Sequence, residues 1–295
     1  MRVILAGGNG FLGRALQRRL EHDAHEVIVL TRRAPARPDE VQWDPNGGRG
    51  AWARVVDGAG AVVNLAGEGI ADRRWSAARK IALRTSRVQS TRSIVAAIES
   101  AESRPPVLVN ASGIGYYGDR GADVVTESAP VGNDFLAAVC VAWEDAATRL
   151  APGTRVALIR SGLVLHPSGG ALARMLLPFR LGVGGRLGSG EQYLSWIHLD
   201  DWVSFVAWMA TDPAAAGPFN ATSPTPVTNA EFTRALGRAL RRPTRLPVPA
   251  FGLRLAFGEL ADTLLTGQRA IPARAQELGF QFRFGEIDSA LRALF

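Results

Sequence analysis

The chain has 295 residues, of which 47% are hydrophobic and 21% are charged, the composition of an ordinary globular protein. Its formal net charge is +7, but the arginines are scattered and form no basic run, which argues against a nucleic-acid partner. No apolar run approaches the roughly 18 residues of a membrane span, and the first strand is expected to begin at Arg2. We therefore expect a cytoplasmic protein with no membrane partner.

Alternating short apolar runs and longer amphipathic stretches occupy the first half of the chain, a pattern typical of βαβ units. Strands are expected at 2–6, 26–30, 61–65, 107–111 and 155–161, and helices at 11–21, 75–101 and 135–150. The sequence thus predicts an α/β fold class, a Rossmann-type doubly wound parallel sheet followed by a smaller, mixed and mainly helical substrate lobe.

The later segments are less regular. Helices are expected at 169–181 and 200–210, a glycine-rich loop at 182–190, and a short strand at 193–198. Thr228 and Glu231 form a capping-box pattern, so a helix should start there and end near Arg242. We divide the chain into a cofactor domain at 1–165, substrate-lobe segments at 166–246 and a helical C-terminal domain at 247–295. Segments after 165 can also add to the sheet of the cofactor domain.

Gly7, Gly10 and Gly13 follow the first strand directly and open the first helix. Glycines in this context permit a tight turn and close approach of a pyrophosphate, while amide groups at the start of the helix bind its oxygens. A plain strand-to-helix turn is the alternative. The pattern predicts a dinucleotide site.

The second strand ends in Leu30-Thr31-Arg32-Arg33. An acidic residue there would bind the adenosine ribose of NAD, whereas arginine suits the 2′-phosphate of NADP. The alternative is that Arg32 and Arg33 are exposed charges of an arginine-rich chain. We therefore expect NADP(H). At the end of another predicted strand, the segment 64–67 should face the adenine and ribose half of the cofactor, or be an ordinary loop exit.

The chain resembles the extended short-chain dehydrogenase/reductases, which include sugar-nucleotide epimerases and dehydratases. The resemblance lies in the glycine turn at 7–13, in the segments 30–33 and 64–67, and in Ser112-Gly113-Ile114-Gly115-Tyr116-Tyr117-Gly118. Further segments, among them Trp143-Glu144 and Trp196-Ile197-His198, narrow the resemblance to an atypical epimerase-like subgroup of uncharacterised substrate, whose C-terminal domain of unknown function resembles 247–295. By position, the resemblance implies cofactor contacts at Gly7, Asn9, Gly10, Phe11, Leu12, Gly13, Thr31, Arg32, Leu65, Ala66, Arg87 and Leu163.

Enzymes of this family generally use a tyrosine as acid or base, a lysine four residues later that lowers its pKa, and a serine that binds the substrate oxygen. The chain departs from that pattern. Lys80 is its only lysine, and Ser76 stands four residues earlier. Phenylalanine and apolar residues fill the expected region, 134–140. Cys140, the only cysteine, excludes an internal disulfide and is expected to be a small buried side chain.

Ser112 is expected to end a strand beside the reacting end of the cofactor, with Tyr116 and Tyr117 within reach. Our hypothesis is that Ser112 binds the substrate and that one of the tyrosines donates or accepts the proton. The alternative for the two tyrosines is aromatic packing in a loop.

Arg160, at the end of a strand, and Arg180, near the glycine-rich loop, are candidates for binding an anionic substrate. Salt bridges within the protein are the alternative for both. His198 lies beside two aspartates and is a third substrate candidate; otherwise it packs under the lobe while Asp200 caps a helix. No cluster has metal-ligand spacing, so no metal is expected.

Two functions remain open from these residues. The first is an NADP(H)-dependent oxidoreductase or epimerase that acts on a carbonyl, a hydroxyl or a nucleotide sugar, with the cofactor carrying the hydride. The second is a catalytically weak or inactive NADP(H)-binding sensor or interaction protein. Fold alone does not separate them, because the chemistry belongs to the site and not to the scaffold. The serine, the tyrosines and the arginines favour the enzyme.

Overall fold

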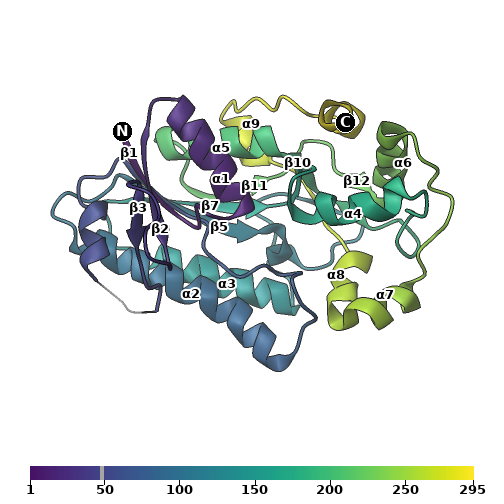
Figure 1. Ribbon diagram of the computed structural model, residues 1–295, viewed down its shortest axis with the longest axis horizontal. Coiled ribbons are helices and arrows are strands. Elements are labelled where there is room, and N and C mark those ends of the chain that lie inside the picture. Colours follow the sequence, from purple (N-terminus) through teal and green to yellow (C-terminus); the bar gives the residue numbers. More distant parts are fainter. Residues whose placement is uncertain (47–49) are drawn as a thin grey trace.

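The computed structural model describes residues 1–46 and 50–295 and has three layers, with helices on both faces of one central sheet (Figure 1). Seven parallel strands form this sheet in the order β11-β7-β5-β4-β1-β2-β3. They are β1 Arg2–Ala6, β2 Glu26–Thr31, β3 Glu40–Gln42, β4 Ala61–Asn64, β5 Val107–Gly113, β7 Arg155–Ser161 and β11 Gly217–Ala221. The winding reverses between β1 and β4, where doubly wound sheets open a ligand crevice. The predicted fold class is confirmed.

Two pairs of helices cover the sheet. α1 Phe11–His22 and α5 Leu199–Thr211 lie on one face, and α2 Ala77–Ser100 and α3 Phe135–Thr148 lie on the other (Figure 1). Successive side chains of β1 alternate between these layers, so Val3 and Leu5 join one core and Ile4 joins the other. Because both faces are covered, the strand is apolar almost throughout.

The second lobe has its own apolar core, built from α4, α6 and α10 around Trp196 and Phe232. Its helices and those of the C-terminal segment are α4 Gly170–Arg180, α6 Asn229–Leu240, α7 Ala250–Phe257, α8 Asp262–Leu265, α9 Ala273–Glu277 and α10 Ile287–Leu294. Short 3-10 helices are η1 Ala51–Val56, η2 Ile114–Tyr117 and η3 Gly258–Ala261. Three two-stranded pairs complete the fold: β8 Leu163–Leu165 with β10 Trp196–His198, β9 Tyr193–Leu194 with β12 Val227–Thr228, and β6 Val124–Val125 with β13 Arg269–Ala270.

The segments after residue 165 contain the main differences from the sequence prediction. The capping box at α6 is confirmed, since Thr228 accepts from the amide of Glu231 and Glu231 accepts from the amide of Thr228. The single strand expected at 193–198 is two short strands, β9 and β10. Strand β11 was not predicted, because its Gly-Pro start lacks a strand signal; Pro218 fits there because β11 is an edge strand. This later segment does return to the sheet.

No helix in residues 1–46 and 50–295 combines the length and the apolar character needed to cross a bilayer. The cytoplasmic location stays a prediction.

Candidate functional site

The turn between β1 and α1 is shaped by its glycines. Gly7 has φ +82°, and a Cβ there would lie 2.8 Å from the carbonyl carbon of Leu65, just after β4. A Cβ on Gly13 would lie 2.3 Å from the carbonyl oxygen of Gly7. The turn, the start of α1 and the end of β4 therefore pack at distances that no side chain would allow.

The N-terminus of α1 is open to an anion. Its N-cap is Gly10, which provides no side-chain cap, and the first turn contains no acidic residue. The first amides of a helix lack partners within it and lie at the positive end of its dipole. At the point between β1 and β4 where the winding reverses, this arrangement fits the pyrophosphate of a dinucleotide.

The predicted contacts for the adenosine half surround this turn. Thr31 is buried at the end of β2, and Arg32 beside it is exposed. The Arg32 side chain forms no ion pair or hydrogen bond with any residue in 1–46 or 50–295, and its contact with a 2′-phosphate stays a prediction. Asn9 reaches Glu40 at 3.4 Å. Ala66, half-buried after β4, donates its amide to the side-chain oxygen of Asn64 at 3.1 Å.

Arg87 lies on α2 and is almost fully buried. Its guanidinium donates to the carbonyl oxygens of Leu83 and Glu68, both at 2.9 Å, and lies over the ring of Trp143. Burial lowers its pKa. Arg87 thus fixes the backbone that follows β4, and a cofactor contact stays a prediction. Leu163, half-buried at the start of β8, likewise stays a predicted contact.

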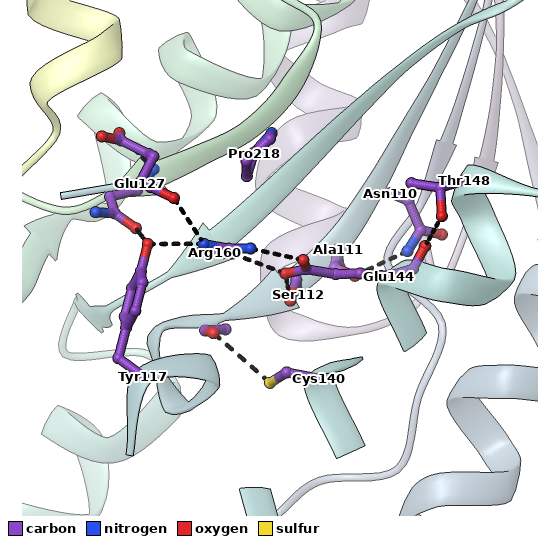
Figure 2. A network of polar contacts seen from close by, with 12 residues as sticks. Asn110, Ala111, Ser112, Tyr117, Glu127, Cys140, Glu144, Thr148, Arg160 and Pro218 are labelled. Atoms are coloured by element: carbon purple, nitrogen blue, oxygen red, sulfur yellow. Dashed lines mark hydrogen bonds and ion pairs between the residues drawn. The ribbon is translucent and has the colours of Figure 1, made fainter. Parts of the chain in front are cut away.

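The ends of β5 and β7 carry a second constellation, in which Ser112 lies opposite Arg160 in register. Ser112 is buried, and its hydroxyl donates to a carboxylate oxygen of Glu144 on α3 at 2.6 Å. Glu144 in turn forms a bidentate ion pair with Arg160, through Nε and Nη2, both at 2.8 Å (Figure 2). The sequence prediction missed Glu144 as a member of the site. Its signals were its place in the Trp143-Glu144 segment of the family resemblance and a carboxylate in a mainly apolar helix.

The two tyrosines have different surroundings. Tyr117 has no exposed surface; its hydroxyl donates to Asn220 Oδ1 at 2.7 Å and accepts from Arg160 Nη1 at 2.9 Å. Burial raises the pKa of Tyr117 to about 12, although Arg160 opposes the shift. Tyr116 is only half-buried, its ring centroid lies 3.5 Å from Arg160 Cζ, and its hydroxyl has no hydrogen bond among the described residues. Tyr116 is therefore the more accessible of the two.

Arg160 does not present a free guanidinium to a substrate. It is 4% exposed, and its donors are used by Glu144, by Tyr117 and by the carbonyl oxygen of Glu127 (Figure 2). Although burial opposes its charge, Glu144 raises the pKa of Arg160. Of the two roles expected for Arg160, the structure supports the salt bridge within the protein. The side chain is not available to bind an anionic substrate.

The face of α3 that meets the end of β5 carries Leu136, Cys140 and Glu144 on successive turns. A Cβ on Gly115 would lie 3.2 Å from Leu136, and the thiol of Cys140 lies 3.6 Å from the carbonyl oxygen of Gly113. Cys140 is buried as predicted, and burial raises its pKa to about 11. Neither Leu136 nor this thiol is suited to acid–base chemistry near neutral pH.

The only lysine lies elsewhere. Lys80, on α2, forms an ion pair with Glu259 of η3 and lies 5.1 Å from the ring centroid of Phe135. It therefore links the cofactor domain to the C-terminal segment.

The structure does not group Arg180 with the other site residues. α4 begins beside the glycine turn, where a Cβ on Gly170 would lie 3.3 Å from the ring of Phe11. Arg180 ends this helix, about 15 Å further along its axis. It is exposed, and no ion pair is found for it in residues 1–46 and 50–295. A direct role beside the cofactor has no support from this position.

His198 is 3% exposed, and its ring lies 3.9 Å from that of Phe284 in the C-terminal segment. Its Nδ1 accepts from the amide of Asp200, so His198 itself is the N-cap of α5. The expectation that Asp200 caps this helix was wrong, because α5 begins at Leu199 and its N-cap therefore lies two residues before Asp200. Burial lowers the pKa of His198, and Nε2 has no partner among the described residues. These contacts favour packing over substrate binding.

A doubly wound parallel sheet with an uncapped glycine turn at its switch point defines a dinucleotide-binding α/β protein. Comparison with known proteins is consistent with this class. Residues 3–222 match the model of the NAD dependent epimerase/dehydratase family, and residues 248–294 match a domain of unknown function, DUF1731. The chain belongs to the NAD-dependent epimerase/dehydratase family, which confirms the resemblance seen in its motifs.

Individual relatives cover the whole chain. An epimerase family protein of Mycobacterium tuberculosis is 48% identical over 292 residues, 98% of this chain and 96% of the relative. The crystal structure of human epimerase family protein SDR39U1 with NADPH superposes with a TM-score of 0.93 at 36% identity, covering 100% and 99% of the two chains. A nucleoside-diphosphate sugar epimerase of Corynebacterium glutamicum superposes with a TM-score of 0.82 at 34% identity, covering all of this chain and 58% of that one.

Proposed function

We propose that the protein binds NADP(H) and acts as an oxidoreductase or epimerase on a hydroxyl or carbonyl carbon of a small molecule, with nucleotide sugars as the first class to test. One observation carries the proposal: the glycine turn and the pair Ser112 and Tyr116 lie at the same carboxyl edge of the sheet, on strands two places apart. The human relative solved with NADPH and the relative named as a sugar epimerase support it.

When bound, NADP(H) would supply or accept the hydride. The amides that begin α1 would hold its pyrophosphate, and Arg32 would hold its 2′-phosphate. Ser112 Oγ donates its own proton to Glu144, so its lone pairs are left to accept a hydrogen bond from a substrate hydroxyl. The hydroxyl of Tyr116 is available to exchange a proton with the substrate, and Arg160 provides a fixed positive charge over its ring. Arg160 and Glu144 are positioning residues in this proposal.

The second candidate is a cofactor-binding protein with weak or no turnover. The observations that favour it are Leu136 and Cys140 on the α3 face beside β5, and Lys80 held in an ion pair with Glu259. In this function the same glycine turn would bind NADP(H), and the protein would report cofactor level or dock a partner.

A turnover assay separates the two functions. The protein is incubated with NADPH, or with NADP⁺ for the reverse direction, and a panel of carbonyl compounds and nucleotide sugars. The cofactor is followed by absorbance and the sugars by chromatography, because an epimerase need not consume cofactor. We expect at least one substrate to react, and Tyr116→Phe to lose about 100-fold in kcat.

Tyr117→Phe is the matched control, since it removes a neighbouring hydroxyl that is fully buried. It should reduce thermal stability and leave kcat within a few-fold of the wild-type value. Tight NADPH binding without reaction across the panel would favour the sensor. Equal kcat values for the wild-type protein and Tyr116→Phe would remove Tyr116 from the proposal.

A further inference from the structure

A groove with a volume of about 420 Å³ lies along the C-terminal half of α6 and the loop after it. In Figure 1, α6 is at the opposite end of the molecule from the N-terminus and from β1 to β3. The groove is lined by Arg234, Gly237, Arg238, Arg241, Arg242, Pro243, Thr244 and Arg245. Five of these eight residues are arginines and none is acidic, and none belongs to the cofactor site. We call this feature the arginine groove.

In the part of the chain that the structure describes, one of the five cations forms an ion pair with a carboxylate. Arg238 forms a bidentate ion pair with Asp288 of α10, at 2.7 and 2.9 Å. The other four arginines of the groove form no ion pair within the described part of the chain: Arg234, Arg241, Arg242 and Arg245. Glu231, a turn before Arg234, is engaged in the capping box of α6. The groove therefore has a local excess of positive charge.

The spacing concentrates this charge. Arg234, Arg238 and Arg241 recur every three to four residues and lie on one face of α6 and its cap, where like charges repel. Cations near a helix C-terminus are favoured by the helix dipole, which accounts for one or two of them. The groove has five arginines, more than the helix dipole accounts for. A multivalent anion bound there would reduce the repulsion between their charges.

The groove is also held in a fixed shape. Arg241, the C-cap residue of α6, is in the left-handed region with φ 53° and ψ 46°, a conformation in which glycine or asparagine is preferred. A Cβ on Gly237 would lie 2.5 Å from Thr244 Cγ2 and 2.9 Å from the carbonyl oxygen of Arg242, so the loop packs directly on the helix. The arginines are thus presented from a close-packed turn.

We propose that the arginine groove binds a small anion with several phosphate groups, such as inorganic triphosphate or the phosphates of a nucleotide. Guanidinium groups bind phosphate oxygens through paired hydrogen bonds, and the volume falls within the range of small-molecule sites. An acidic peptide fits less well, because protein interfaces depend on apolar anchors and Pro243 is the only apolar side chain of the lining. This site is separate from the cofactor site and does not depend on the proposed activity.

Calorimetric titration with inorganic triphosphate tests the proposal. The full-length protein is first saturated with NADPH, so that the glycine turn does not compete for the probe. The double variant Arg242→Gln with Arg245→Gln should bind triphosphate about tenfold more weakly or worse. The matched control is Arg92→Gln with Arg149→Gln, which removes the same charge from exposed positions on α2 and α3 and should leave the affinity unchanged.

Arg241→Gly separates binding from folding. Glycine adopts the left-handed cap conformation without strain, so this variant should raise the Tm by about 1–2 °C while it weakens triphosphate binding. Equal affinities for the groove double variant and the control double variant would overturn the proposal, since binding would then follow net charge alone. Tighter binding of a polyglutamate peptide than of triphosphate would overturn it as well and would indicate an acidic protein partner.

Discussion

The two parts of the proposed site are built in different ways: the glycine turn between β1 and α1, which we call the cofactor end, and the side-chain network at the ends of β5 and β7, which we call the proposed reacting end. At the cofactor end, the turn from Gly7 to Gly13 works through its backbone: close packing and unpaired amides make the site, and side chains must be absent. At the proposed reacting end, buried side chains make the site, with Glu144 joining Ser112 to Arg160. A site made by the backbone is formed by a few residues that are neighbours in the sequence, whereas a side-chain network is formed by residues that are far apart in the sequence.

Changing Glu144 should have the largest effect on the proposed reacting end. Glu144→Ala leaves the guanidinium of Arg160 buried without its counter-charge, so the free energy of unfolding should fall by about 3–5 kcal/mol. Urea unfolding measures this loss. The double variant Glu144→Met with Arg160→Met should recover most of it, because both charges of the buried pair are removed together. A loss below about 1 kcal/mol in the single variant would show that the network is not the structural centre of this end.

Adding one methyl group tests the cofactor end. Gly13→Ala forces a Cβ to within 2.3 Å of the carbonyl oxygen of Gly7. We expect the free energy of NADPH binding to weaken by about 1–3 kcal/mol, which is roughly 5- to 150-fold in affinity, as measured by fluorescence titration. Gly285→Ala is the control, because nothing lies within 4 Å of a Cβ there. Similar NADPH affinities in the two variants would contradict a backbone-built site.

Cofactor choice depends on a side chain at this otherwise backbone-built end. Arg32→Ala should weaken NADPH about tenfold and leave NADH unchanged, because only NADPH has the 2′-phosphate. Arg33→Ala, one residue further along, serves as the control and should have a smaller effect. Parallel titrations of both cofactors measure the ratio. An unchanged ratio in Arg32→Ala would place the selection elsewhere.

The smallest expected effect is a pH dependence at His198. Burial lowers its pKa from 6.5 in the folded protein, so below about pH 6.5 the unfolded state binds the proton more readily. Stability should therefore fall as the pH decreases from 6.5 towards the folded pKa, by at most about 1.4 kcal/mol per pH unit. His198→Asn keeps a capping side chain and removes the titration. Urea unfolding between pH 7 and 5 should show a shallower slope in the variant, and identical slopes would contradict this origin.

Local patterns in the sequence identified most of the first domain. The alternation of apolar runs and helices predicted five strands of the sheet, β1, β2, β4, β5 and β7, and Thr228 with Glu231 predicted the start of α6. Strand β11 was missed because a Gly-Pro start and a short, edge-strand sequence have no periodic signal. The cap of α5 was expected at Asp200 and lies two residues earlier at His198, because the sequence alone defines a helix boundary only to within one or two residues.

The sequence by itself determined the doubly wound fold, the family and the dinucleotide turn, because each depends on residues that are neighbours in the chain. Only the tertiary structure decided which groups are available for chemistry. It placed Tyr117 and Arg160 in a buried network, gave the hydroxyl of Tyr116 no hydrogen bond to any residue in 1–46 or 50–295, and brought Glu144 to Ser112. Burial and pairing are properties of residues far apart in sequence, and they decide whether a polar side chain supports the fold or meets a substrate.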